Sequence, residues 1–445
     1  MNCVFLLHFR FTILDSIFSS PLAPILQQDP RQIYQLVDHL FRHESGKMVA
    51  VLSRLIGFEN FETAQDIVQD TLLRAMQSWR YGSIPHNPSA WLYRVAKNKA
   101  IDFVRREKKY QQIVPQYANL LQSEYGLTSI VATMFSDNEI QDSQLRMMFA
   151  CCHSSINEES QIAIILKTLC GLNVSEIARA FICTEDTISK RIYRAKEKIR
   201  AEKIELEVPD DELLPERLDA VLKSLYLLFN EGYNSSQPDQ LIRRDLCEEA
   251  IRLCFLLTQN NRIRFPRTYA LLALMHFQTS RFDTRIDSTG SIILLKNQDR
   301  GLWNKETIQK GFDLLEQAAE PFETSTYHFE AAIASLHAAA PSFEQTDWKS
   351  IYDLYELLYR YQPNPIIALH KAIASGYAIS KENALDELTK LKGLEKNHLY
   401  YASLGEIYYE LKKPSEAKSY FEQAMLYTTS ISEQQLLRNK IVRCD

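Results

Sequence analysis

Residues 173–200 constrain the fold of this chain more than any other stretch, because they carry the signals of two short helices with a tight break between them. Asn173 is a favoured N-cap residue, and Glu176 follows three positions later, as in a capping box. The apolar residues that this first helix is expected to bury are Ile177, Ala178 and Phe181. The pattern predicts a helix that opens at Asn173 and a break over residues 181–184.

The second helix has one apolar face and one cationic face. Thr184 is placed to cap it, and Glu185 and Asp186 occupy the first turn, where the helix dipole favours acids. The apolar stripe consists of Ile188, Ile192, Ala195 and Ile199. The opposite face carries Lys190, Arg191, Arg194 and Lys198. The two helices predict a helix-turn-helix unit whose cations face a DNA major groove and its phosphates. The alternative is an ordinary helical hairpin with a solvated charged face.

Composition indicates a multidomain, mostly helical protein. The 445 residues are too many for one core and suggest roughly three domains. With only 12 Gly and 15 Pro and no sustained alternation of apolar residues, the fold class is predicted to be all-α. The net charge of -5 is unevenly divided, because residues 1–203 carry 24 Lys and Arg against 21 Asp and Glu, whereas residues 204–445 carry 27 against 35. A basic front and an acidic back suit a nucleic-acid module joined to a regulatory half.

The cysteines and the N-terminus argue against export and membrane insertion. The eight cysteines, at positions 3, 151, 152, 170, 183, 247, 254 and 444, lack disulfide or zinc-ribbon spacing, which favours a cytoplasmic protein without metal or cofactor. Cys151, Cys152 and His153 suggest a metal site, but adjacent cysteines on a helix point apart. The longest apolar run near the N-terminus, residues 4–7, is too short to span a bilayer. We expect residues 1–32 to be a disordered extension or a misplaced start.

Residues 33–109 show helical periodicity throughout. One long amphipathic helix is predicted over residues 60–79, with Glu62, Asp66 and Asp70 on its outer face. A loop over residues 81–88 follows, and Ser89 is expected to cap a second helix that ends near residue 108. This second helix carries basic residues on one side, with aromatic residues around the loop, a combination that suits single-stranded DNA. For Trp79 and Trp91 a core position is favoured.

Three segments in this order resemble the bacterial sigma factors of the extracytoplasmic-function type. The run "AQDIVQDTLLRAMQSW" resembles the sigma region 2 helix that docks on RNA polymerase, and "PSAWLYRVAKNKAIDFVRR" resembles the following helix, which melts and holds the −10 element. The run "GLNVSEIARAFICTEDTISKRIYRAKEKIR" resembles sigma region 4, which binds the −35 element. The resemblance implies region 2 at residues 33–109, a linker at 110–140 and region 4 at 141–205.

A narrower resemblance is to the branch of these factors that has a long C-terminal extension. It is carried by "LRMMFACCHSSINEESQIAIILKTLCGL", "LYLLFNEGYNSS", "LLALMHFQTSR", "QDRGLW" and "TDWKSIYDLYELL". It implies a helical extension domain at residues 213–315 and tetratricopeptide-like repeats at 316–445. The repeat spacing is clearest at Tyr401, Leu404, Gly405, Tyr408, Ala417, Phe421 and Ala424. Residues 284–295 are expected to form at most a small hairpin.

The resemblance implies a protein that binds core RNA polymerase and promoter DNA, without catalysing a reaction. The residues predicted to face the polymerase are Asp66, Gln69 and Asp70. Those predicted to face the melted −10 strand are Tyr81, Tyr93, Arg94, Asn98 and Arg105. Those predicted to face the −35 duplex are Ser189, Lys190, Arg191, Tyr193 and Arg194, through bases or phosphates.

Control is expected to lie in residues 213–445, through contacts with the rest of the chain or the polymerase, or through a regulatory protein or ligand. Truncation near Pro209 should then change transcription strongly. The polar groups at residues 230–233 and 298–303 are candidate contacts for a ligand or the polymerase, although interdomain packing is favoured. Two rival classes stay open: a helix-turn-helix repressor with a protein-binding scaffold, and an enzyme with its active site around Glu231 and Asp299.

Overall fold

The structure is a computed structural model that describes residues 30–107, 124–181, 183–235, 241–288, 290–320 and 323–445. Within these ranges every regular element is a helix, and the one strand-type pairing is an isolated antiparallel bridge between Ile286 and Ile292. The all-α prediction is confirmed, and the small hairpin expected at residues 284–295 amounts to this bridge. Residues 1–29, which hold most of the predicted N-terminal extension, lie outside the described ranges.

The N-terminal bundle corresponds to the predicted region 2. Its helices are α2 (Pro30–Ile56), η1 (Phe58–Asn60), α3 (Phe61–Tyr81), α4 (Pro88–Glu107) and α5 (Glu124–Met134). α3 is amphipathic as predicted, since it buries Ala64, Val68, Leu72, Ala75 and Trp79 and exposes Glu62, Asp66 and Asp70. At the start of α4 the capping oxygen comes from Asn87 instead of Ser89, because Asn87 Oδ1 accepts the N–H of Ala90 at 2.9 Å.

The predicted linker at residues 110–140 was wrong in its second half. α5 lies within it, and the next helix already begins at Asp137. α5 packs against α2 and α4 and buries Ile130, Val131 and Met134. The C-terminal half of the predicted linker is therefore part of the N-terminal bundle.

The helix-turn-helix unit consists of α6 (Asp137–Cys151), α7 (Glu158–Thr168), α8 (Val174–Ala180) and α9 (Glu185–Ala201). Both predicted caps are present. Asn173 and Glu176 form a capping box at the start of α8, and the Thr184 side chain accepts the N–H of Thr187 at the start of α9. Phe181, predicted to be buried, is half-buried, because it ends α8 at the edge of the turn.

The extension domain packs directly on the helix-turn-helix unit. It consists of α10 (Leu214–Tyr233), α11 (Arg244–Thr258), α12 (Pro266–Thr279), η3 (Phe282–Thr284), η4 (Leu295–Asn297), η5 (Arg300–Leu302) and α13 (Lys305–Gln317). α10 contacts α6, α7 and α8, and α11 contacts α6. Residues 205–213 therefore connect the helix-turn-helix unit to the extension domain, and the two modules pack against each other.

The repeat domain is a row of helix pairs. Its helices are α14 (Thr326–Ala339), α15 (Trp348–Tyr361), α16 (Pro365–Ala378), α17 (Lys381–Thr389), α18 (His398–Glu410), α19 (Pro414–Tyr427) and α20 (Ile431–Val442). α18 and α19 approach closely at Gly405, where an added Cβ would lie 2.6 Å from ring carbons of Phe421. Gly405 and Phe421, a small and a large residue of the predicted repeat pattern, therefore pack against each other between α18 and α19.

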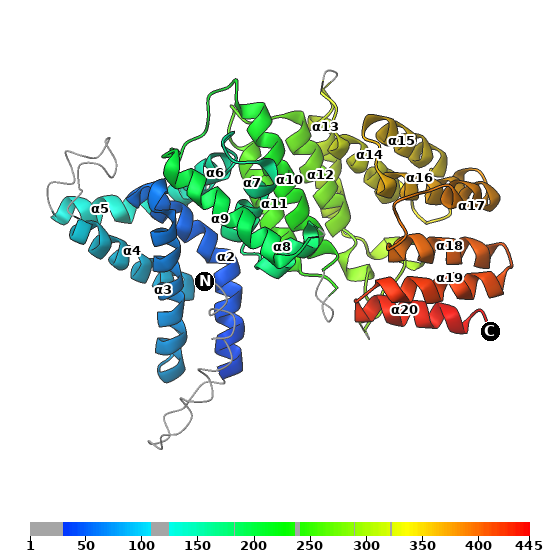
Figure 1. The fold of residues 1–445 in the computed structure, drawn as a ribbon, viewed down its shortest axis with the longest axis horizontal. Helices are drawn as coiled ribbons and strands as arrows, with labels where there is room; N and C mark the ends of the chain where they lie inside the picture. Colours follow the sequence, from blue (N-terminus) through cyan, green and yellow to red (C-terminus); the bar gives the residue numbers. More distant parts are fainter. Residues whose placement is uncertain (1–29, 108–123, 182, 236–240, 289, 321–322) are drawn as a thin grey trace, which may run out of the picture.

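One apolar core runs through the N-terminal bundle, the helix-turn-helix unit and the extension domain, whereas the repeat domain adds smaller cores of its own. Figure 1 shows the bundle at one end of an elongated molecule and the repeats at the other. The backbones approach closely at Gly46 of α2, where an added Cβ would lie 2.4 Å from the carbonyl oxygen of Leu169. The two predicted DNA-facing modules are thus packed against each other.

Candidate nucleic-acid and polymerase interface

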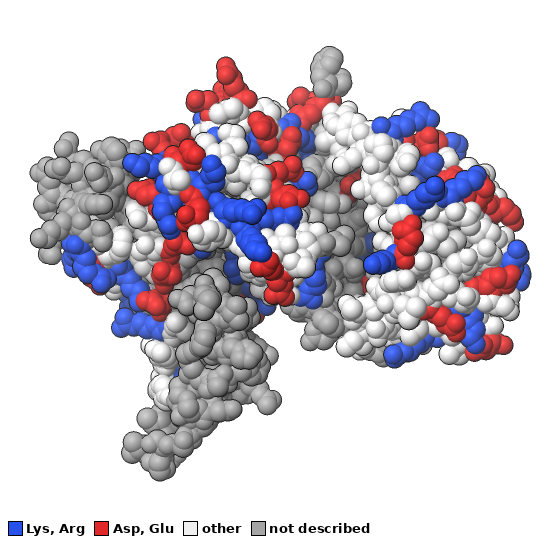
Figure 2. Space-filling view, viewed as in Figure 1, with Lys and Arg blue, Asp and Glu red and all other residues white. Residues whose placement is uncertain are grey.

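The exposed face of α9 carries four of the five residues predicted for duplex DNA. Ile188, Ile192, Ala195 and Ile199 are buried, and this fixes the opposite face toward solvent. Ser189, Lys190, Tyr193 and Arg194 are exposed there, with Tyr193 at 64%. Figure 2 shows Lys and Arg side chains gathered over the α9 part of this face, with acidic side chains around them. Lys190 pairs with Asp186 at 2.6 Å, an exposed contact that DNA phosphate can replace.

Arg191 differs from these four. Its side chain is only 17% exposed and pairs with Glu159 of α7, and its Cζ lies 5.3 Å from the centroid of the Phe181 ring. Its Nη1 also donates to Cys183 Sγ at 3.7 Å. These contacts join α9 to α7 and to the turn, so the geometry gives Arg191 a positioning role instead of a free DNA-facing one.

The candidate single-strand surface lies on α4 and the loop before it. Tyr81 is 60% exposed, and Arg94, Asn98 and Arg105 are exposed along α4. Trp79 is buried and lies 5.4 Å, centroid to centroid, from the half-buried Trp91, so the core prediction for Trp79 is confirmed.

Tyr93 is held by the protein. Its hydroxyl donates to Glu44 Oε2, and its ring centroid lies 5.8 Å from that of Phe135. Burial, and then the negative charge of Glu44, raise the pKa of Tyr93. Ser89 Oγ donates to the other oxygen of Glu44 at 3.1 Å. Glu44 therefore connects α4 to α2. Tyr93 contributes to the single-strand surface mainly by orienting α4, because its hydroxyl is bonded to Glu44.

The residues predicted for the polymerase, Asp66, Gln69 and Asp70, are all exposed on α3. Asp70 pairs with Lys99 of α4 at 3.2 Å. Partial burial raises the pKa of Asp66, and the nearby Lys196 opposes this shift. Lys196 belongs to α9, so the predicted polymerase surface lies close to the helix-turn-helix unit.

A set of exposed contacts joins the start of α3 to the end of α9. Glu62 pairs with Arg200 and lies 3.6 Å from Lys196 Nζ. Lys196 Nζ also lies 5.8 Å from the centroid of the Phe61 ring. In this structure α3, the helix that carries the candidate polymerase surface, therefore contacts α9 near its own start.

A buried ion cluster, which no sequence pattern predicts, links the extension domain to the helix-turn-helix unit. Arg243, 1% exposed, donates through Nη1 to Glu176 Oε1 and lies 3.8 Å from Glu231 Oε1. Glu176 is also the residue that completes the capping box of α8. Arg243 directly precedes α11, and its partner Glu176 is 67 residues away, so no local pattern connects the two.

The residues on which an enzyme would depend have structural roles. Glu231 belongs to the buried cluster, and Asp299 accepts the N–H of Gly301 at 2.8 Å as a cap of η5. Arg300 donates to the carbonyls of His337 and Ala340 and to Thr346, so the packing interpretation of this segment is confirmed. Cys151 and Cys152 are buried, and burial raises the pKa of Cys151 to about 12. In the described part of the chain, no group of three or more His, Cys, Asp or Glu side chains is placed to hold a metal.

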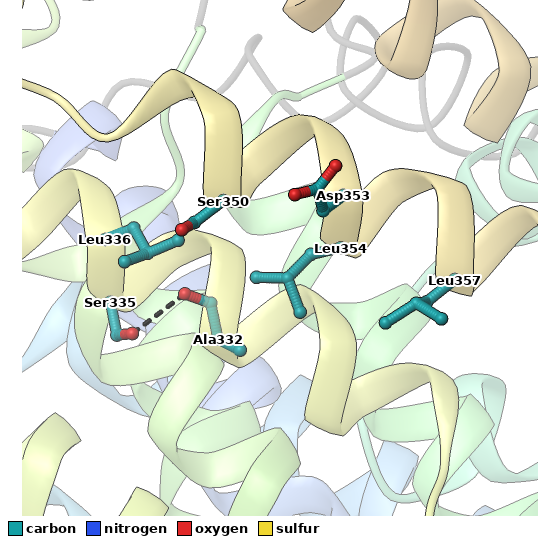
Figure 3. A pocket seen from close by; sticks show the side chains of 7 residues that line it. All are labelled: Ala332, Ser335, Leu336, Ser350, Asp353, Leu354 and Leu357. Atoms are coloured by element: carbon teal, nitrogen blue, oxygen red, sulfur yellow. Dashed lines mark hydrogen bonds between the residues drawn. The ribbon is translucent and has the colours of Figure 1, made fainter. Parts of the chain in front are cut away.

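The repeat domain carries a shallow groove between α14 and α15. Figure 3 shows its lining, which consists of Ala332, Ser335, Leu336, Ser350, Asp353, Leu354 and Leu357. Ser335 Oγ donates to the carbonyl of Ala332 at 2.8 Å, and Asp353 pairs with Lys349. The groove is mainly apolar, and Asp353 is the one carboxylate in its lining.

Family models match three parts of the chain. Residues 40–110 match Sigma-70 region 2, residues 146–199 match Sigma-70 region 4, and residues 217–319 match a family of unknown function (DUF6596). The first two matches coincide with the N-terminal bundle and the helix-turn-helix unit, and the third with the extension domain. The tetratricopeptide assignment of residues 316–445 stays a prediction.

Some relatives match most of the chain and others match a smaller part of it. The uncharacterized protein R00370 of Rhizobium meliloti (strain 1021) is 35% identical over 385 residues, covering 86% of this chain and 90% of the relative. The ECF RNA polymerase sigma-E factor of Haemophilus influenzae is 27% identical over 187 residues, covering 40% of this chain and 91% of the relative. The ECF RNA polymerase sigma factor EcfG of Rhodopseudomonas palustris is 28% identical over 146 residues, covering 32% of this chain and 72% of the relative. No solved structure matches.

A region 2 bundle followed by a region 4 helix-turn-helix unit defines an RNA polymerase sigma factor of the sigma-70 class. The chain belongs to the extracytoplasmic-function type of this family, in a form extended by two further helical domains. None of the described helices is both long enough and apolar enough to cross a membrane.

Proposed function

We propose that this chain brings core RNA polymerase to a two-part promoter, with α9 on the upstream element and α4 on the melted downstream strand. The observation that carries the proposal is the exposed face of α9, which is held outward by its buried stripe. Ser189, Lys190, Tyr193 and Arg194 would face bases and phosphates of the −35 duplex. Arg191 would keep α9 in place through Glu159.

At the downstream element, the proposed contacts are Tyr81, Arg94, Asn98 and Arg105. The cations would hold the backbone of the unpaired strand, and the exposed Tyr81 would stack with a base. An unpaired base in a pocket supplies sequence specificity. Tyr93 would act through Glu44, by fixing α4 to α2.

Polymerase would bind the exposed polar surface of α3 that contains Asp66, Gln69 and Asp70. Because Glu62 on this helix pairs with Arg200 of α9, we expect the polymerase to compete with α9 for the start of α3. The chain would act in the cytoplasm and by binding alone, with all bond making and breaking left to the polymerase.

The extension domain and the repeats would control the helix-turn-helix unit. The support is the buried contact of Arg243 with Glu176, which places a residue of the extension domain on the capping box of α8. A change in the extension domain would thereby alter how α8 and α9 are held.

Run-off transcription tests the proposed function. DNA from upstream of the chain's own gene is transcribed with purified core polymerase, with and without the full-length chain. A discrete transcript that needs both proteins is expected. Binding to this DNA without polymerase, together with no transcript and no association with core polymerase, would contradict the proposal and favour the repressor with a scaffold.

A further inference from the structure

Two arginines of the extension domain share one tyrosine at the end of α10. Arg281 Nε donates to the hydroxyl of Tyr233 at 2.6 Å. The Cζ of Arg285 lies 3.7 Å from the centroid of the same ring, and its Nη1 donates to the backbone carbonyl of Tyr233. Arg281 and Arg285 are both half-buried, and their shared contact with Tyr233 brings their guanidinium groups to the same side chain.

This pair of positive charges has no acidic counterpart in the described part of the chain. The protein acceptors of Arg281 and Arg285 are the hydroxyl and the carbonyl of Tyr233, and neither guanidinium group forms an ion pair with a described Asp or Glu. The neighbouring Arg244, in contrast, pairs with Asp283. Partly buried charges in proteins are ordinarily paired, so two like charges held together lack a partner of opposite sign.

Nearby groups respond to this excess of positive charge. Burial, and then the charge of Arg281, lower the pKa of Arg300 and lower that of His337 to about 3. Arg300 itself bonds only to carbonyls and to a hydroxyl. The positive cluster therefore extends from Arg281 and Arg285 toward the loop that follows α14.

We propose that Arg281, Arg285 and Tyr233 form a binding site for a phosphoryl dianion. Guanidinium groups match phosphate geometry and charge, and a phosphoryl group with nearly two negative charges would neutralise both arginines, whereas a carboxylate would neutralise one. Because the Tyr233 oxygen accepts from Arg281, its own hydrogen is available to donate to the ligand. The Tyr233 ring is already covered by Arg285 and lies parallel to Phe229, so the site recognises the phosphoryl group instead of a stacked base.

The site adjoins the link to the helix-turn-helix unit. Gly232, next to Tyr233, accepts the backbone N–H of Arg243 at 2.7 Å, and Arg243 holds Glu176. A phosphoryl ligand at this site is one through which the extension domain would act on the helix-turn-helix unit, and this role rests on the proposed function. Binding itself does not depend on it.

Thermal unfolding of the full-length chain in inorganic phosphate, against chloride at equal ionic strength, tests the site without polymerase. We expect a saturable rise in Tm for the wild type, because a ligand of the folded state stabilises it. Arg281→Gln/Arg285→Gln should lose this rise, and the matched control Arg244→Gln, whose charge is already paired, should keep it. No saturable rise in the wild type, or an equal rise in the double variant, would overturn the site.

A gentler variant covers the case in which the double variant does not fold. Tyr233→Phe keeps the ring and removes only the hydroxyl, so it should bind phosphate at least several-fold more weakly by calorimetry. Wild-type affinity in Tyr233→Phe would refute the proposed geometry. Glycerol phosphate serves as a second probe: tighter binding than inorganic phosphate assigns the site to phosphate monoesters, and equal or weaker binding assigns it to the free ion. If neither probe binds, the phosphoryl site is refuted, but the outcome of run-off transcription does not depend on this result. The phosphoryl site and the proposed function can therefore fail separately.

Discussion

At the scale of single residues, Arg243 is expected to matter most for the stability of the fold. Its side chain is 1% exposed, and Glu176 and Glu231 are 3% and 4% exposed. Taking charges out of water is costly unless each has a partner of opposite sign. The guanidinium of Arg243 contacts Glu176 of the helix-turn-helix unit and lies near Glu231 of the extension domain. Loss of Arg243 therefore removes a positive charge from beside both carboxylates.

Arg243→Leu should therefore lower the free energy of unfolding by about 3–5 kcal/mol, the range for breaking a buried pair. Urea denaturation followed by circular dichroism measures this loss. The adjacent Arg244→Leu, which removes an exposed pair with Asp283, should cost at most about 1 kcal/mol. Adding Glu176→Gln to Arg243→Leu should recover part of the loss. Equal effects of the two single variants would show that the cluster is not a stability determinant.

Residue roles were predictable where their partners are near in sequence. The Asn173 capping box and the Thr184 cap involve residues three positions apart, and both are as predicted. Tyr93 and Arg191 were predicted to face DNA, but their partners Glu44 and Glu159 are 49 and 32 residues away. Such partners depend on how helices pack, which the local pattern does not contain.

At the scale of elements, α10 and α14 join the extension domain to the repeats. Tyr226 of α10 donates to Glu330 of α14 at 2.8 Å, and the ring centroids of Tyr226 and Tyr327 lie 5.6 Å apart. Burial raises the pKa of Glu330 to about 7 from a usual value of 4.5, and the hydrogen bond from Tyr226 opposes the shift. The two domains thus meet at a carboxyl group that holds its proton below about pH 7 in the folded protein.

This raised pKa predicts the sign of a pH effect. Between pH 4.5 and about 7 the folded protein keeps a proton on Glu330 that the unfolded chain has lost, so this contribution to stability is full below pH 4.5 and declines as the pH rises toward 7. Glu330→Gln mimics the neutral group and should remove this part of the slope. Tm measured at intervals from pH 4.5 to 7.5 compares the two. An identical slope in the variant would disprove the assignment.

Elements were predicted well where periodicity is strong and poorly where it is weak. α9 has a regular apolar stripe and clear caps, and its range agrees with the prediction. The α5 sequence, "EYGLTSIVATM", does not predict a helix, because it contains Gly and several β-branched residues and lacks an obvious polar face. Its helix is stabilised by packing on α2 and α4, which is tertiary information.

At the scale of the whole molecule, the sigma modules and the extension domain form one packed body. The same apolar core includes residues of α2, α7 and α10. Truncation near Pro209 would remove Arg243 and uncover the faces of α6 and α7 that pack on α10. A change in transcription after truncation would therefore mix regulation with loss of stability, and point variants are the cleaner test.

Arg200→Ala tests whether the contact between α9 and α3 restrains polymerase binding. The pair with Glu62 is exposed, so the free energy of unfolding should change by less than about 1 kcal/mol. If polymerase competes with α9 for α3, affinity for core polymerase should rise by up to about fivefold, the equivalent of that energy. Arg360→Ala, which removes an exposed pair with Glu356 in the repeat domain, is the control. Unchanged or weaker polymerase binding in Arg200→Ala would count against competition.

The most direct test of the account is run-off transcription with core polymerase and the variant Lys190→Ala/Arg194→Ala. Loss of two DNA contacts, each worth about 1–3 kcal/mol, should lower transcript yield at least tenfold while the fold is retained. The matched control is Lys349→Ala/Arg360→Ala, which removes two exposed cations of the repeat domain. Both are paired one helical turn away, as Lys190 is with Asp186. Transcription lost in the first variant and kept in the second is the predicted result. Full transcription from a folded Lys190→Ala/Arg194→Ala protein would contradict promoter recognition through α9.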